Sequence, residues 1–120
     1  MPEIRQLKPR EAAEFCLDDI RKDPTRLATL QTIHRAYHES DNDENGNNLF
    51  GTDGVVGAYV IAQVYQIVPI GSSKRIDGEM KEKVFNPLGI ELVADPTEEK
   101  SASHNFYNHL GRGLTQRQSL

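Results

Sequence analysis

Residues 55–68 read VVGAYVIAQVYQIV and form the longest apolar run of this 120-residue chain. Two interpretations fit the segment. As a strand, its alternate positions would make a small apolar face of valines and alanines. As a helix, its polar residues Gln63 and Gln66 are three positions apart and would share one face. A strand of this length would be more than twice the average, whereas the length is ordinary for a helix, so we predict a buried central helix.

Two helices are predicted before this segment, and each starts at a proline. Proline suits the first helical position because its φ is already helical and its missing N–H would have no partner there. Pro9 is predicted to begin a helix over 9–22. The apolar stripe of that helix consists of Ala13, Cys16, Leu17 and Ile20. Pro24 is predicted to begin the next helix, which runs to about Glu39, with Asp23 as its N-cap.

A helix and a strand are predicted after the central segment. Apolar residues spaced by four predict a helix over 73–85, and Asn86-Pro87 is expected to end it. The alternation in Gly89–Ala94 (GIELVA) predicts a short strand.

The last helix is predicted from a capping signal. Asp95-Pro96 is followed by Glu98, three residues after Asp95, in the spacing of a capping box. Gly111 is a suitable residue to end this helix. The last helix is therefore expected to run from 95 to 110.

The fold expected from these elements is mostly α: a small compact domain of four to five helices with one short strand near 89–94. The alternative is an α+β domain in which 55–68 is a long central strand. We predict one globular domain over 1–110 and a flexible C-terminal tail over 111–120.

Composition limits the class of protein. The net charge of −4 disfavours binding to nucleic acid, which needs an excess of Lys and Arg. A single cysteine cannot form an internal disulfide, and the first residues lack the apolar run of a signal peptide. The whole apolar run, 55–70, is interrupted by Gln63 and Gln66 and is too short to span a bilayer. We therefore expect an acidic, soluble, cytoplasmic protein with no membrane partner.

The loop after the second helix carries a partial calcium motif. Asp41, Asp43, Asn45 and the following glycine match the opening of a calcium-binding loop, in which alternate oxygen ligands converge on the ion. The twelfth position, where a bidentate Glu is expected, holds Thr52. One inserted residue would place Asp53 there instead. A calcium-binding loop over 41–53 is therefore an alternative to a solvated acidic loop.

His34 and His38 suggest a second metal hypothesis. Two histidines four residues apart project from one face of a helix and can share an ion. No glutamate follows His34, so the general base of the familiar HExxH metalloprotease site is missing. A loop carboxylate would have to complete the site. The competing interpretation is that His34 lies at the edge of the core and His38 on the surface.

The last predicted helix carries a group of polar and aromatic side chains that could contact a partner. The candidate binding residues are His104, Asn105, Tyr107 and His109. Cys16, by contrast, lies within an apolar stripe and is interpreted as a buried small hydrophobe rather than a nucleophile.

No standard catalytic motif is present, which favours a function other than catalysis. We predict a small non-enzymatic interaction or regulatory module that binds a protein or associates with itself, without a cofactor. The first alternative is a metal-dependent hydrolase that uses His34, His38 and a loop carboxylate, with a divalent metal that activates water. The second is a calcium-binding protein.

Overall fold

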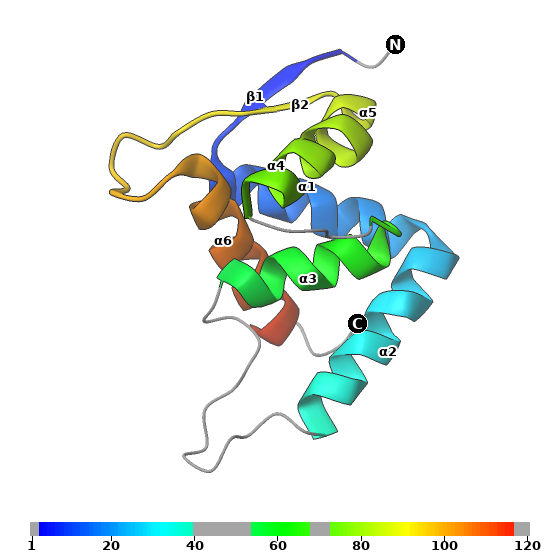
Figure 1. Ribbon diagram of the computed structural model, residues 1–120. Helices are drawn as coiled ribbons and strands as arrows, with labels where there is room; N and C mark the ends of the chain where they lie inside the picture. Colours follow the sequence, from blue (N-terminus) through cyan, green and yellow to red (C-terminus); the bar gives the residue numbers. More distant parts are fainter. Residues whose placement is uncertain (1–2, 40–53, 68–72, 117–120) are drawn as a thin grey trace.

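The computed structural model describes residues 3–39, 54–67 and 73–116 and has a mostly helical fold (Figure 1). Its elements are β1 (Arg5–Leu7), α1 (Pro9–Lys22), α2 (Pro24–Glu39), α3 (Gly54–Val64), α4 (Ser73–Met80), the π-helix η1 (Lys81–Phe85), α5 (Asn86–Leu88), β2 (Ile90–Leu92) and α6 (Ala102–Gln116). Helices α4, η1 and α5 follow one another without a break. The predicted mostly α fold class is confirmed.

The first two helices begin and end where the sequence predicts. The backbone N–H of Lys8 donates to the Glu11 carboxylate at 2.9 Å, which satisfies a donor ahead of the first turn of α1. Asp23 separates the two helices. Its Oδ1 accepts the backbone N–H groups of Thr25 at 2.9 Å and of Arg26 at 3.3 Å. Asp23 therefore caps α2 as predicted.

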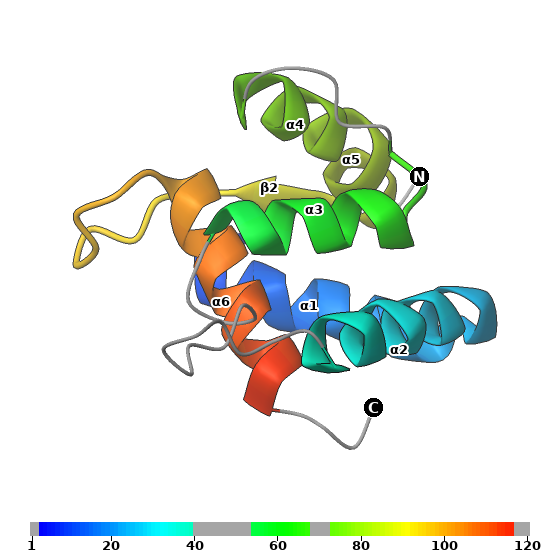
Figure 2. The same ribbon diagram turned by 60° about the horizontal axis from the view of Figure 1, so that its bottom comes forward.

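Helix α3 is the buried central helix that the sequence predicts, and the strand alternative is wrong. It contacts α2, α4 and α6 (Figure 1, Figure 2). Its buried side chains are those of Ala58, Val60, Ile61, Ala62 and Val64. The two glutamines, Gln63 and Gln66, are exposed. The helix ends where Gln66 adopts a left-handed φ of 59° and the Ile67 N–H donates to the Ala62 carbonyl at 2.6 Å.

The predicted end of a helix at Asn86-Pro87 is wrong. The chain stays helical to Leu88, and the helix ends at Gly89. Gly89 has a φ of 73° and donates its N–H to the Asn86 carbonyl at 3.0 Å. Pro87 has no N–H with which to make a helical hydrogen bond. The π-helix just before it makes wider turns, in which Asn86 donates to the Lys81 carbonyl. The helix continues past the proline because the hydrogen-bond pattern has already changed there.

Strands β1 and β2 form a parallel two-stranded sheet. The register pairs Arg5 with Ile90, Gln6 with Glu91, and Leu7 with Leu92. The short strand predicted near 89–94 is therefore confirmed, whereas β1 was not predicted. Three residues are too few for a clear apolar alternation. The sheet contacts α1 and the end of the helix that precedes β2.

The predicted start of the last helix at Asp95 is wrong. Asp95 forms a turn instead: its Oδ1 accepts the backbone N–H of Thr97 at 2.9 Å and the Thr97 hydroxyl at 2.7 Å. Helix α6 begins at Ala102. Its cap is Ser101, whose Oγ accepts the His104 N–H at 3.2 Å. Both Asp95 and Ser101 are suitable caps, so the local sequence does not distinguish between them.

The predicted end of the last helix at Gly111 is also wrong, because α6 continues to Gln116. The helix therefore extends into the segment that the sequence assigns to a tail. A Cβ added at Gly113 would lie 2.6 Å from Cδ1 of the buried Leu17. Glycine at this position allows α6 to pack closely against α1. Gly113 thus serves helix packing, and Gly111, the predicted end, lies inside α6.

Phe106 lies at the centre of the core, where it is fully buried. Its ring meets that of Phe85 edge to face, with centroids 5.0 Å apart, and that of Tyr107 at 5.2 Å. These contacts join α6 to η1. Within the described ranges, no helix is long and apolar enough to cross a membrane.

Candidate functional site

The two metal hypotheses fall mostly on residues outside the described part of the chain. His34 and His38 lie one turn apart on α2, but their side chains are not described. The loop residues Asp41, Asp43, Asn45 and Asp53 also lie outside the described ranges. Among the described residues, no group of three or more His, Cys, Asp or Glu side chains is placed to hold a metal ion. Both hypotheses therefore stay predictions.

Tyr107 is not on the surface, contrary to the expectation that the aromatic residues of the last helix are exposed. It is 6% exposed, and its hydroxyl donates to Oδ1 of Asp77 on α4 at 3.1 Å. Burial, together with the charge of Asp77, raises the pKa of Tyr107 above its usual range. Its ring packs in the core, and its hydroxyl ties α6 to α4.

The other three candidate residues on α6 hold the connection from β2 to α6. The Nδ2 of Asn105 donates to the Lys100 carbonyl at 2.9 Å. The partly buried His109 lies with Nε2 3.0 Å from Oε1 of Glu98. His104 contributes its backbone N–H to the Ser101 cap. The described polar contacts of the four candidate residues are thus made to other residues of this protein.

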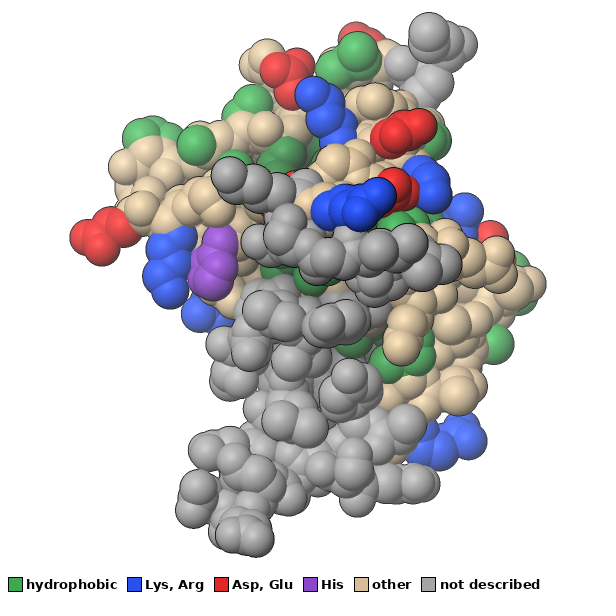
Figure 3. All heavy atoms as spheres, in the orientation of Figure 1, with side chains coloured by type: hydrophobic (Ala, Val, Ile, Leu, Met, Phe, Trp, Pro, Cys, Tyr) green, Lys and Arg blue, Asp and Glu red, His purple; other side chains and the backbone are tan. Residues whose placement is uncertain are grey.

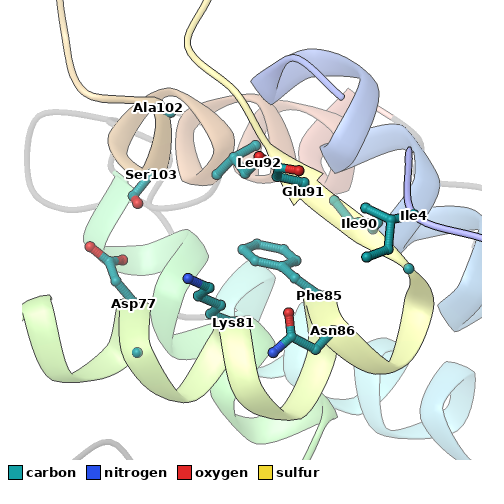
Figure 4. Close-up of a pocket in the computed structure, with 12 residues that line it drawn as sticks. Ile4, Asp77, Lys81, Phe85, Asn86, Ile90, Glu91, Leu92, Ala102 and Ser103 are labelled. Atoms are coloured by element: carbon teal, nitrogen blue, oxygen red, sulfur yellow. The ribbon is translucent and has the colours of Figure 1, made fainter. Parts of the chain in front are cut away.

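A groove of about 860 Å³ lies between the helix formed by α4, η1 and α5 and the strand β2 (Figure 4). Its lining residues are Ile4, Asp77, Gly78, Lys81, Phe85, Asn86, Gly89, Ile90, Glu91, Leu92, Ala102 and Ser103. Figure 4 shows the Phe85 ring between the helix and β2, with Ile4 towards one end of the groove and Asp77 and Ser103 towards the other. We refer to this feature as the α4–β2 groove.

The floor of the α4–β2 groove is apolar and its rim is polar. Phe85 and Ile90 are buried and Leu92 is half-buried, whereas Lys81, Asn86 and Glu91 are exposed. An apolar floor with a few polar groups is typical of binding sites. Ile4 extends the apolar surface beyond one end. It is 69% exposed, and among the described residues it is the large hydrophobic side chain that faces solvent.

The π-helix η1 supplies two residues of the groove. Lys81 and Phe85, its first and last residues, both line it. π-helical segments are rare and are frequently found at functional sites, because the wider turn redirects side chains. Gly78 on the preceding helix α4 also lines the groove, and a Cβ added there would meet no atom within 4 Å. A side chain larger than that of Gly78 would therefore occupy part of the groove.

Cys16 is fully buried, as the sequence predicts. Burial, with a smaller effect of the Asp19 carboxylate, raises the pKa of the Cys16 thiol to about 12. The thiolate that a nucleophile requires is therefore disfavoured in the folded protein.

Nearby, Asp19 joins three helical regions. Its Oδ2 accepts the hydroxyl of Tyr65 at 2.6 Å and a guanidinium N–H of Arg26 at 2.9 Å. The Arg26 guanidinium also lies over the Tyr65 ring, 4.6 Å from its centroid. These contacts connect α1, α2 and the end of α3 and have a structural role.

The groove residues carry no recognisable motif, although the sequence predicts most of the helix and the strand on which they lie. One local signal was present: Gly78 lies within a helix, where glycine is unfavourable. A glycine within a helix suggests either close packing or an open surface on the face of the helix where it lies. The rest of the site depends on how distant elements meet.

Comparison with known proteins gives no relative: no protein-family model, curated protein or solved structure matches the chain.

Proposed function

We propose that this protein is a non-enzymatic interaction module that binds a short apolar segment of a partner protein in the α4–β2 groove. The observation that carries the proposal is the combination of an apolar floor with a rim that bears both charge signs. We also propose that the protein is cytoplasmic, as its composition suggests.

The floor of the groove is suited to binding because its side chains are packed into the core. Phe85 is 6% exposed and packs edge to face on Phe106. Ile90 is held in the sheet beside Arg5. A floor that needs little rearrangement loses little entropy when a partner binds. Apolar side chains of a partner would therefore bind without the added cost of reordering the floor.

The rim favours a peptide over a polyanion. Lys81 is the basic residue of the lining, and Asp77 and Glu91 carry the opposite charge. A phosphate-binding surface would need an excess of basic groups. On the face drawn in Figure 3, basic and acidic side chains of the described residues are interspersed. Peptide backbone and mixed side chains suit such a rim.

The test uses a side chain that fills the groove without touching the core. In Gly78→Trp the indole would enter the α4–β2 groove, and the new Cβ meets no neighbouring atom. The matched control is Lys83→Trp, an exposed position on the same helix outside the groove lining. Circular dichroism should show that both variants are folded; Lys83→Trp also loses the surface ion pair between Lys83 and Glu79, which is expected to have little effect on stability.

Peptides selected from a displayed random library on the wild-type protein supply the probe. We expect apolar peptides that bind the wild type and Lys83→Trp equally and bind Gly78→Trp at least about tenfold more weakly, since loss of one buried apolar side chain costs about 1.5–3 kcal/mol. Affinities would be measured by fluorescence anisotropy. Equal binding to Gly78→Trp, or a selection that enriches no peptide, would refute the groove as the binding surface.

A further inference from the structure

We propose that the partner segment binds in the α4–β2 groove as an added β-strand, through backbone hydrogen bonds to the free edge of β2 at Leu92 and Ala94. The inference rests on the proposed function, since it specifies how the groove holds its peptide. It defines the partner as an extended segment with apolar side chains at alternate positions.

The hydrogen bonds to β1 determine which backbone groups of β2 are already used. The Gly89 carbonyl accepts the Arg5 N–H at 2.7 Å, and Val93 donates its N–H to the Leu7 carbonyl at 2.9 Å. In the parallel register of the two strands, Glu91 lies between these bonds and faces β1 with both its N–H and its carbonyl. The odd-numbered residues of this stretch therefore pair with β1.

The even-numbered residues point their backbone groups away from β1, because these groups alternate along a strand. Among the described residues the sheet consists of β1 and β2, so no third strand occupies this edge. Ile90 is buried, whereas Leu92 is half-buried and Ala94 is exposed. The accessible part of the edge therefore starts at Leu92. An unpaired edge is a template for another strand, and a two-stranded sheet is stabilised by a third.

The free edge of β2 borders the groove. Leu92 lines it together with Lys81 and Phe85, which lie on the helix that forms the other wall. Figure 4 shows the Phe85 ring between that helix and β2. A strand paired with Leu92 would lie about 4.8 Å from β2, on the side of the groove. Because its other side faces the helix, this place suits a single segment rather than another folded sheet.

An extended segment satisfies this edge and a helical one does not. The residues of a helix bond their own backbone groups to each other, which would leave the N–H and carbonyl of Leu92 unpaired. An added strand also sorts its side chains. Those level with Leu92 would lie on the core side, near Phe85, and those between them on the side of the exposed Glu91. Apolar and polar residues should therefore alternate in the segment.

A scan of the backbone of the peptide tests this pairing. The probe is the tightest peptide selected on the wild-type protein, prepared as a series in which one backbone N–H at a time is N-methylated. Methylation of an amide that faces β2 removes a hydrogen bond and should weaken binding about tenfold or more. Methylation of the adjacent amide, the matched control, should change the Kd less than about threefold. Fluorescence anisotropy should show two sensitive amides, two positions apart.

Hydrogen exchange followed by NMR tests the same edge from the side of the protein. The Leu92 N–H should exchange rapidly in the free chain and at least about tenfold more slowly in the peptide complex. Glu91 and Val93 are internal controls, because their N–H groups bond to β1. Their exchange should be slow in both states.

Three results would overturn the proposal. The first is equal sensitivity to methylation at every interior amide, which would indicate a bound helix. The second is exchange at Leu92 that the peptide leaves unchanged. In both cases the proposed function stands if Gly78→Trp still weakens binding, so the two failures are distinguishable. The third is a selection that enriches no peptide, which would overturn the proposed function as well.

Discussion

At the scale of single residues, Tyr65 shows how a partly buried polar group depends on its surroundings. Its hydroxyl donates to Asp19, which is also bound by Arg26. Burial is the main cause that raises the pKa of Tyr65 above its usual range, and the hydrogen bond to Asp19 adds to it. The folded protein therefore holds this proton more tightly than the unfolded chain, in which the pKa is near 10.0.

The effect of Tyr65 on stability should depend on pH. Above pH 10 the unfolded chain loses the Tyr65 proton while the folded state keeps it, so the stability of the wild type falls as the pH rises. Tyr65→Phe should cost about 1 kcal/mol at pH 7 through the lost hydrogen bond, and this difference should shrink above pH 10. Urea denaturation between pH 7 and pH 11 measures both effects.

The same change at Tyr107, which is more deeply buried than Tyr65, serves as a comparison. The pKa of Tyr107 is also raised, mainly by burial. Tyr107→Phe should therefore behave in the same direction as Tyr65→Phe. If wild type and Tyr65→Phe lost stability in parallel up to pH 11, the assignment of a buried, protonated Tyr65 would be wrong.

At the scale of elements, glycines within helices have opposite roles in this fold. Gly113 lets α6 approach α1, since a Cβ there would lie 2.6 Å from Leu17. Gly78 faces the open groove, where a Cβ meets nothing. Both occur in helical sequence, where alanine has an intrinsic advantage of about 1 kcal/mol over glycine. The sequence around them does not reveal which glycine is needed.

The same substitution at these two glycines should have effects of opposite sign. Gly113→Ala forces the packed Leu17 side chain to move, and overpacking costs about 1–3 kcal/mol, more than the helix propensity returns. We expect a net loss of about 1 kcal/mol. Gly78→Ala should instead gain up to about 1 kcal/mol. Urea denaturation followed by circular dichroism measures both, and equal stabilities would argue against the close contact of α6 with α1.

Part of the candidate site could be predicted at this scale. The helix from 73 and the strand near 89–94 are carried by local apolar spacing, and both are present. The candidate residues on α6 were harder to interpret. His104 to His109 go around more than one full turn of the helix, so only some of them can face solvent. Tyr107 lies inward, against Phe106 and with its hydroxyl bonded to Asp77 on α4, and no local signal specifies that choice.

At the scale of the whole molecule, the core is shared by helices from both halves of the chain. Helix α1 packs against α6, and α3 packs against both α2 and α6. Cys16 on α1 lies inside this assembly with no exposed surface. Its reactivity therefore reports on the opening of the whole fold rather than on a local feature.

The thiol of Cys16 should be protected until the protein unfolds. With its pKa raised to about 12 and no solvent access, it should not react with a disulfide reagent at pH 8 in the absence of denaturant. In urea, one thiol per chain should react. Gln6→Cys provides an exposed thiol that should react at once. A rapid reaction of Cys16 in the native protein would mean that α1 detaches without global unfolding.

The sequence by itself determined the helical class, both ends of α1 and α2, and the central place of the apolar helix α3. These features depend on proline, capping residues and apolar spacing, which act over a few residues. Tertiary structure alone decided the pairing of β1, both ends of α6 and the α4–β2 groove. Each of these depends on segments far apart in the chain: β1 needs β2, Gly113 needs Leu17, and the groove needs a helix beside a strand. Local propensities differ by about 1 kcal/mol or less per residue, which a single packed contact can outweigh.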